Sequence, residues 1–309
     1  MAYGGPGRLD EVEAYYTDIR HGAPPPPALL QELIGRYRAI GGASPLGGIV
    51  ERQRAALELE LERRDRHVPV HAGMRHVEPR IGTVLREMAA AGIDHVVCIA
   101  LAPQRSPGIV GYREAVGDAL GPLGVGAPSV EVVESWHDEA GFIRALAAAT
   151  ADAIATVARA TRRAVVFTAH SLPARLGDEA EAYRAEVEHT AALVADALGL
   201  AEYVVALQSA GRTGERWLGP DLRDEIRRLA REGAGAVVVC PVGFVADHLE
   251  VLYDIDIDAR AVAEDAGVEL VRARSMNDDP TFIGALADVA CRALRASGQH
   301  PPTPSGVAP

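Results

Sequence analysis

The sequence has few cysteines. It contains three in 309 residues, Cys98, Cys240 and Cys291, and these are far apart with no Cys-x-x-Cys pair. Such spacing does not match the usual zinc or iron–sulfur ligand patterns. Cys98 and Cys240 lie in apolar runs typical of strands, so we expect buried thiols rather than metal ligands.

Long apolar runs and positive charge are also scarce. No stretch approaches the roughly 18 uninterrupted apolar residues that a membrane-spanning helix needs. Residues 1–6 have neither a basic nor an apolar secretory region, so we expect a cytoplasmic protein. Lysine and arginine number 31 against 43 aspartate and glutamate residues, a net charge of −12. This imbalance argues against nucleic acid as a partner and requires local arginines for any anionic ligand.

From residue 67 onward the chain alternates between apolar strand patterns and helical patterns, after helical patterns over 10–19, 29–40 and 50–64. Strict alternation with apolar strands predicts parallel sheets covered by helices on both faces. We therefore expect the α/β class with two doubly wound domains, 1–145 plus 278–297 and 146–277, and a disordered tail over 298–309. The strands are expected at 67–73, 95–101, 130–135, 164–169, 203–208, 236–240 and 268–272.

The first four residues have the pattern of a strand end. Met1-Ala2-Tyr3-Gly4 resembles the last part of a strand whose beginning is missing. We therefore expect either that the first sheet is short by several residues or that the start codon is misassigned.

The first chemical signal follows a strand pattern. Val165, Val166 and Phe167 predict a buried parallel strand, and His170 stands where that strand should end. Open α/β sheets bind ligands outside the carboxyl ends of their strands, which places His170 where such a fold carries its chemistry. The alternative is a structural histidine that is held by a backbone carbonyl at a strand–helix junction.

A second signal comes about 80 positions later, after the strand pattern 236–240. Glu250 opens a predicted helix on which Asp254 and Asp258 follow at four-residue spacing, so three carboxylates share one face. Such a face is either solvated or used for cations. The apolar Leu252 and its neighbours argue against a fully exposed helix.

Three chemistries can be compared for these residues. A calcium loop over 254–265 is rejected, because Ala259 and Asp265 stand where glycine and glutamate are required. A serine hydrolase is disfavoured, because Ser171 directly follows His170 and no Gly-x-Ser-x-Gly motif is present. Imidazole with carboxylate suits ferrous iron and its neighbours, and the same pair can accept protons near neutral pH.

Two of these segments together resemble the ferrochelatase family, namely Phe167–Pro173 and Pro241–Asp254. The similarity extends over nearly the whole chain, through Gln208–Gly211, Trp217–Pro220, Ile40–Leu46 and His76–Pro79. The sequence resembles the coproporphyrin III ferrochelatases of Gram-positive bacteria in particular at Tyr3-Gly4, Tyr15–Thr17, Ile19-Arg20 and Arg36-Tyr37.

The resemblance implies two chelatase-type domains and the insertion of Fe²⁺ into a porphyrin between them. His170 and Glu250 match the catalytic iron-site pair, and Asp254 and Asp258 match an acidic row proposed to carry metal or protons. Tyr3 matches a tyrosine that can ligate the iron of bound product. Porphyrin contacts are implied for Tyr3, Arg20, Arg36, Tyr37, Ser44 and Tyr112.

The chain also departs from the family pattern. Residues 104–108 are altered where relatives are richer in hydroxyl and aromatic groups, and His21 replaces a second basic residue. Some members bind a [2Fe–2S] cluster through four cysteines, which three dispersed cysteines cannot supply. We therefore expect no iron–sulfur cluster and no cofactor beyond the substrate Fe²⁺.

Two functions of different class are weighed. A non-catalytic porphyrin or haem carrier would use Tyr3 and the arginines, but it has no need of His170, Glu250 or the acidic row, so an enzyme is favoured. A protoporphyrin IX ferrochelatase and a cobalt or nickel chelatase stay as alternatives. We expect the protein to be a monomer. Its expected partners are coproporphyrin III and Fe²⁺, with transient contacts to neighbouring enzymes of haem synthesis.

Overall fold

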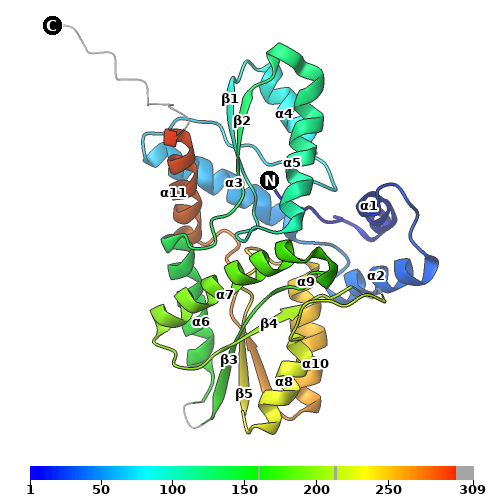
Figure 1. The fold of residues 1–309 in the computed structure, drawn as a ribbon, viewed down its shortest axis with the longest axis vertical. Helices are drawn as coiled ribbons and strands as arrows, with labels where there is room; N and C mark the ends of the chain where they lie inside the picture. Colours follow the sequence, from blue (N-terminus) through cyan, green and yellow to red (C-terminus); the bar gives the residue numbers. More distant parts are fainter. Residues whose placement is uncertain (159–160, 212–213, 297–309) are drawn as a thin grey trace, which may run out of the picture.

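The computed structural model describes residues 1–158, 161–211 and 214–296 as two lobes, each with its own parallel sheet (Figure 1). The first lobe is built on β1 (His95–Ile99) and β2 (Ser129–Val133). The second sheet has the order β4-β3-β5-β6, with strands β3 (Arg163–His170), β4 (Val204–Gln208), β5 (Ala236–Cys240) and β6 (Glu269–Arg272). The α/β class with two helix-flanked parallel sheets is confirmed.

Helices occupy most of the remaining chain. The helices of the N-terminal half are η1 (Leu9–Glu11), α1 (Val12–Ile19), α2 (Pro27–Ala39), α3 (Leu46–Arg63), α4 (Ile81–Ala90), α5 (Pro107–Leu120), η2 (Gly121–Gly126) and α6 (Ala140–Thr156). Those of the C-terminal half are η3 (Ala174–Leu176), α7 (Asp178–Leu198), α8 (Leu222–Arg231), α9 (Leu249–Leu252), η4 (Asp254–Ala259), α10 (Arg260–Asp265) and α11 (Pro280–Ala296). Among the described residues no helix combines the length and the apolar character needed to span a bilayer.

The predicted strand at 67–73 is wrong. This segment is extended, but the nearest strand-type pairings are two isolated parallel bridges of Met74, just past its end, to Ala2 and to Arg80. Residues 1–3 lie beside it, because the amide of Ala2 donates to Gly73 O and that of Arg75 donates to Ala2 O. The segment has the apolar pattern of a strand but lacks a continuous neighbour to pair with.

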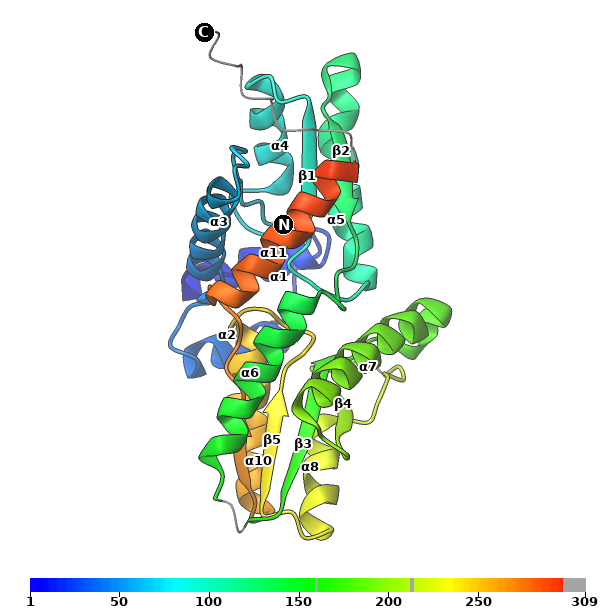
Figure 2. The same cartoon turned by 90° about the vertical axis from the view of Figure 1, so that its left-hand side faces the viewer.

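Strand residues of the second sheet alternate between two cores. Val165 and Phe167 pack on the face covered by α6 and α7, whereas Val166 packs on the face covered by α8 and α10 (Figure 2). Apolar residues on both faces are what a central parallel strand requires, because helices exclude water from both sides. β3 is therefore fixed in the middle of the sheet, which determines where its carboxyl end lies.

The last helix connects the two lobes. Phe282 and Leu286 of α11 join the core around α6, while Ala287 and Cys291 pack with Leu61 of α3. The predicted domain division at 145/146 falls inside α6, whose buried residues begin at 141. The predicted disordered tail, 298–309, lies outside the described residues.

Helices η1, α1 and α2 form an N-terminal arm that projects to one side of the lobes (Figure 1). Its core contains Val12, Tyr15 and Tyr37, and these residues pack with Leu249 of α9. The arm therefore reaches the part of the second lobe that follows β5.

Candidate functional site

His170 is the last residue of β3, and its side chain is partly exposed, whereas Ala169 before it is fully buried. The Nδ1 atom of His170 lies within hydrogen-bond distance of the carbonyl oxygen of Ser171. Because a carbonyl can only accept, Nδ1 is the donor, and in the neutral imidazole the lone pair is then on Nε2. His170 can thus offer Nε2 to a metal ion or to a proton.

The sheet order places this histidine at a topological switch point. β3 pairs with β4 on one side and with β5 on the other, and the connections to these two neighbours cover opposite faces. In such sheets the crevice at the carboxyl ends of the diverging strands is the usual ligand site. The loop that follows β5 crosses this end closely, since a Cβ on Gly243 would lie 2.5 Å from the Cβ of Ala169.

Glu250 lies next to this strand end through a buried amide. Gln208, the strand partner of His170 on β4, donates from Nε2 to Glu250 O at 2.7 Å. The Oε1 atom of Gln208 accepts from Thr168 Oγ1 at 3.1 Å. These two bonds tie β3, β4 and α9 together, so the backbones of His170 and Glu250 are held on one short chain of contacts.

The carboxylate of Glu250 faces a second histidine. His248 Nε2 lies 3.3 Å from Glu250 Oε2, and His248 Nδ1 lies 2.8 Å from Ala246 O, where it must donate. A hydrogen bond between Nε2 and the carboxylate then requires one more proton on either group. His248 therefore places a ring nitrogen next to the carboxylate of Glu250. Sequence reasoning did not assign a role to His248.

The prediction that the acidic row lies on one regular α-helix is wrong. The chain changes from α9 to the π-helix η4 at Asp254, and the amide of Asp258 donates to Tyr253 O, five residues back, at 2.9 Å. Each of the two aspartates, Asp254 and Asp258, forms an ion pair with a different arginine. Asp254 lies 3.4 Å from Arg36 and bonds Ser209 Oγ, whereas Asp258 lies 3.2 Å from Arg223. π-Turns of this kind are frequent at functional sites.

Burial raises the pKa of Asp254, and the charge of Glu250 adds to the effect, while Ser209, Arg36 and His170 oppose it. A carboxyl whose folded pKa is raised stabilises the fold below its unfolded pKa, near 4, and this contribution is lost as the pH rises through the folded pKa. Asp254→Asn should therefore gain in melting temperature relative to the parent as the pH increases from 4 to 7. Thermal unfolding at several pH values, with Asp258→Asn as control, measures this trend. A difference that falls with pH would contradict it.

The predicted tyrosine ligand lies at the edge of the arm. The ring of Tyr3 is 39% exposed and packs on His76, with ring centroids 4.4 Å apart. Crowding by protein raises the pKa of the Tyr3 hydroxyl to about 12, and the charge of Glu250 acts in the same direction. Tyr3 is therefore held protonated near neutral pH and close enough to Glu250 to sense its charge.

The remaining predicted porphyrin contacts differ in their burial and in their partners within the protein. Tyr37 and Tyr112 are buried, at 2% and 5% exposure, and burial raises the pKa of both hydroxyls. Arg36 bonds Glu32 at 2.8 Å, besides Asp254, and its guanidinium lies 5.1 Å from the ring of Tyr253. The Oγ atom of Ser44 accepts from the amide of Leu46. Arg36 is thus a partner of the acidic row in this structure.

Arg20 is different. Its guanidinium lies 5.8 Å from the ring of Tyr16, and its Nε atom is buried without a hydrogen-bond partner among the described residues. A buried donor without a partner is costly, by about 1–3 kcal/mol. Arg20 is therefore suited to bind an anionic group.

Sequence reasoning missed a network behind Tyr3. His76 Nδ1 lies 2.6 Å from Asp18 Oδ2, and Arg80 donates to both oxygens of Asp18 at 2.8 and 3.0 Å. Arg75 lies across the backbone of Gly111, where a Cβ would fall 1.9 Å from the guanidinium carbon. The motif 76–79 was noted in the sequence, but no spacing rule connects it with Asp18, 58 residues before His76.

Comparisons with known proteins identify the family of this chain. The family model described as Ferrochelatase matches residues 1–294. The chain is 42% identical to a coproporphyrin III ferrochelatase of Geobacillus kaustophilus, covering 97% of this chain and 96% of the relative. It is 39% identical to a coproporphyrin III ferrochelatase of Halalkalibacterium halodurans, covering 94% of each chain.

A solved structure supports the fold. SirB from Bacillus subtilis with Fe³⁺ matches with a TM-score of 0.56 at 16% identity, covering 81% of this chain and 92% of that one. At this identity the likeness concerns the fold alone. The family model and the curated relatives cover nearly the whole sequence, and the chain belongs to the ferrochelatase family.

Proposed function

We propose that this protein is a coproporphyrin III ferrochelatase, which inserts Fe²⁺ into coproporphyrin III to give the iron porphyrin. The observation that supports the proposal is that the backbone of Glu250 is tied, through Gln208, to the strand end that His170 occupies. His170 offers the lone pair of Nε2, and Glu250 is tied beside it through Gln208. The named substrate of the curated relatives in Geobacillus and Halalkalibacterium supports the choice of ring.

The chemistry needs both groups. As Fe²⁺ enters the ring, two pyrrolic N–H bonds break and two protons leave, so the site must hold a cation loosely and accept protons. In the proposal His170 Nε2 and a carboxylate oxygen of Glu250 hold the iron on its way to the ring. The same pair receives the protons, and His248, 3.3 Å from Glu250, passes them on. Asp254 and Asp258 then form a path for cations or protons away from the pair.

The acidic path predicts a defect in iron use. Asp254→Asn with Asp258→Asn should raise the iron concentration for half-maximal rate about fivefold or more, because two negative charges that attract the cation are lost. Rates measured against Fe²⁺ concentration test this, with Glu264→Gln plus Asp265→Asn, two exposed carboxylates of α10, as the charge-matched control. An unchanged half-maximal concentration would assign the row to folding alone.

We expect Arg20 to contribute to the preference between the two porphyrins. Coproporphyrin III has four propionates and protoporphyrin IX has two. An arginine whose Nε has no hydrogen-bond partner among the described residues can distinguish them by a charge-assisted pair worth about 1.5–3 kcal/mol. Arg20→Ala should weaken the binding of coproporphyrin III about tenfold or more and that of protoporphyrin IX less. Fluorescence titration of both rings into parent and variant decides it. An equal loss would mean that Arg20 contacts a shared propionate.

The experiment that tests the function itself is anaerobic insertion of Fe²⁺, with coproporphyrin III compared with protoporphyrin IX. The expected result is a higher kcat/KM for coproporphyrin III. A preference for protoporphyrin IX would assign the other ring. Tight binding of either ring without insertion would indicate a carrier, and the proposal would then be wrong.

The proposal also includes three properties of the working enzyme. It acts in the cytoplasm as a monomer, it uses no resident cofactor or iron–sulfur cluster, and it contacts neighbouring enzymes of haem synthesis only transiently. Support for the second property comes from the cysteines, which are all buried and unpaired with one another. Metal analysis of the purified protein and sedimentation at several concentrations test the cofactor and the oligomeric state.

A further inference from the structure

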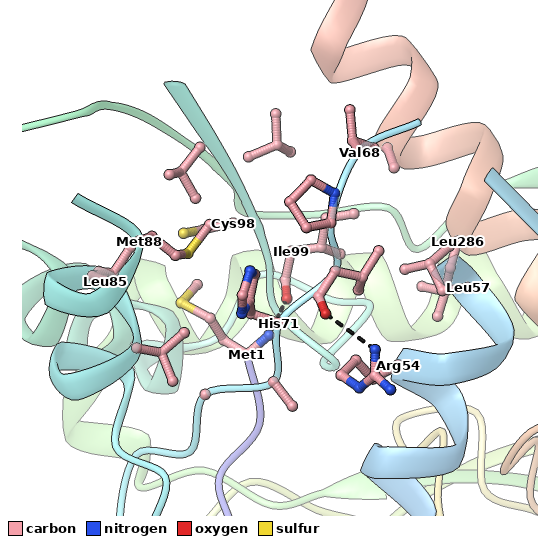
Figure 3. A pocket seen from close by; sticks show the side chains of 18 of the residues that line it. Met1, Arg54, Leu57, Val68, His71, Leu85, Met88, Cys98, Ile99 and Leu286 are labelled. Atoms are coloured by element: carbon pink, nitrogen blue, oxygen red, sulfur yellow. Dashed lines mark hydrogen bonds between the residues drawn. The ribbon is translucent and has the colours of Figure 1, made fainter. Parts of the chain in front are cut away.

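A cavity of about 300 Å³ lies inside the first lobe, and its lining is mainly apolar side chains of β1, α3, α4 and α11 (Figure 3). One polar lining residue, Gln53 of α3, is buried and donates from Nε2 to Asn277 O at 2.7 Å. This bond leads out of the first lobe to a cluster of charged side chains in the second, where Asn277 also bonds Asp247. The centre of that cluster is Arg272.

Arg272 is the last residue of β6, and its side chain is 14% exposed. Its Nε atom donates to Asp256 Oδ1 at 2.8 Å, and its Nη1 atom lies 3.3 Å from Asp247 Oδ1. Hydrogen bonds between charged groups are about twice as strong as neutral ones, and the planar guanidinium gives them fixed directions. One largely buried arginine thus holds two carboxylates, and we call these three residues the arginine clamp.

Asp247, at one end of the clamp, is also held by the loop that follows β6. Ser275 Oγ and Asn277 Nδ2 donate to its two carboxylate oxygens at 2.7 and 2.9 Å, and its own amide donates to Asn277 Oδ1 at 2.9 Å. Asp247 lies three residues before Glu250. The start of the segment that carries Glu250 is therefore fixed beside the end of β6.

Asp256 is the other end of the clamp. It lies in η4 between Asp254 and Asp258, the two aspartates of the acidic row. Ile255 beside it is fully buried in the apolar core. Burial of apolar groups is non-directional, so it does not by itself favour a π-turn, which is rare, over an α-turn. The bond from Arg272 is directional and can therefore select the register of η4.

Arg260 supports the same segment from a more exposed position. Its side chain is 42% exposed, its Nε atom donates to Asp256 O at 3.0 Å, and its Nη1 atom donates to Leu270 O at 3.0 Å. It therefore ties two backbone carbonyls together, and its Nη2 atom stays 3.8 Å from the Asp256 carboxylate. The closer contact to that carboxylate comes from Arg272.

We propose that Arg272 is a positioning residue of the iron site. By holding Asp247 and Asp256 at once, it fixes the segment between them, which carries Glu250 and Asp254. Its effect on iron insertion rests on the proposed function, whereas its effect on the order of the segment does not. Lysine in its place would keep the charge but lacks the planar fork that holds both carboxylates.

The first measurement is hydrogen exchange of the porphyrin-free protein, followed by mass spectrometry. In Arg272→Gln the amides of Asp254–Ala259 should exchange about tenfold faster than in the parent or more, and Arg272→Lys should lie between the two. Arg274→Gln is the matched control, because it removes a 48% exposed arginine that pairs with Asp279 on the same stretch of chain. Exchange of His95–Ile99 in the first lobe is the internal reference.

The second measurement is anaerobic iron insertion at a temperature where every variant is folded. We expect Arg272→Gln to lower kcat about tenfold or more and to raise the iron concentration for half-maximal rate, because small displacements of reacting groups are costly. The affinity for coproporphyrin III should change less than about twofold, and Arg274→Gln should keep the parent's constants. An arginine that only stabilises the fold would lower the melting temperature and leave these constants unchanged.

Equal exchange at Asp254–Ala259 in Arg272→Gln and Arg274→Gln would overturn the clamp, whatever the protein catalyses. Faster exchange with unchanged kinetic constants would overturn the positioning role. If Arg272→Gln does not fold, Asp256→Ala is measured by the same two criteria, since it leaves the arginine paired with Asp247. If the parent inserts no iron, the proposed function is wrong and the positioning role is wrong with it, whereas the exchange data still decide whether the clamp orders the segment.

Discussion

His170→Ala should reduce iron insertion about 10²–10⁴-fold while porphyrin affinity changes little. The reason is positional, because Nδ1 of His170 is occupied by Ser171 O and only Nε2 is presented beyond the end of β3. Loss of a group that binds the metal and takes a proton in the transition state has an effect of this size. Single-turnover insertion rates together with porphyrin fluorescence titration separate the chemical step from binding.

A histidine elsewhere in the second lobe serves as the control. His189 is exposed on α7 and its ring contacts His137, so His189→Ala changes a histidine without touching the end of β3. We expect that variant to insert iron at the parent's rate. If His170→Ala inserted iron equally well, His170 would be a structural histidine held by its carbonyl contact.

Glu250→Gln should also reduce insertion about 10²–10⁴-fold. The amide keeps the size of the side chain, and the backbone bond from Gln208 to Glu250 O stays, so the change removes charge and basicity rather than position. If His170 and Glu250 act as one unit, the double variant should be little slower than either single variant, since effects within a unit are far from additive.

The measurement is the full cycle of parent, two single variants and the double variant. Losses that multiply across the cycle would mean that the two residues act in separate steps, which would contradict a shared site. The melting temperature of Glu250→Gln should stay near the parent's, because the side chain is 35% exposed. A large loss of stability would identify a structural carboxylate instead.

Six of the seven expected strands were predictable within two residues because both faces of each are apolar or half-buried, as in 236–240. The seventh, 67–73, has the same local pattern but no strand beside it along its length. Pairing is a non-local property, so the sequence of a segment shows that it is extended without showing that it is paired.

The candidate site was likewise predictable only in part. The placement of His170 followed from the rule for strand ends in open sheets, and the family motifs pointed to Glu250. The hydrogen bond from the side-chain amide of Gln208 to Glu250 O and the ion pair of Arg36 with Asp254 were not predictable, because they join segments 42 and 218 residues apart. The π-turn at Asp254 was not predictable, since each of its residues is compatible with an ordinary α-helix.

The position of α11 has a consequence for the order of folding. The second sheet is complete once the chain has been made to residue 272, and its strands are consecutive. The first lobe needs α11, residues 280–296, to cover α3 and β1, although those elements are synthesised some 200 residues earlier. Contacts of such long range slow folding. During synthesis the strands of the second sheet can therefore pair before α11 emerges. The core around α6 that Phe282 and Leu286 complete, and the apolar surface of the N-terminal lobe, stay uncovered until the end of the chain leaves the ribosome.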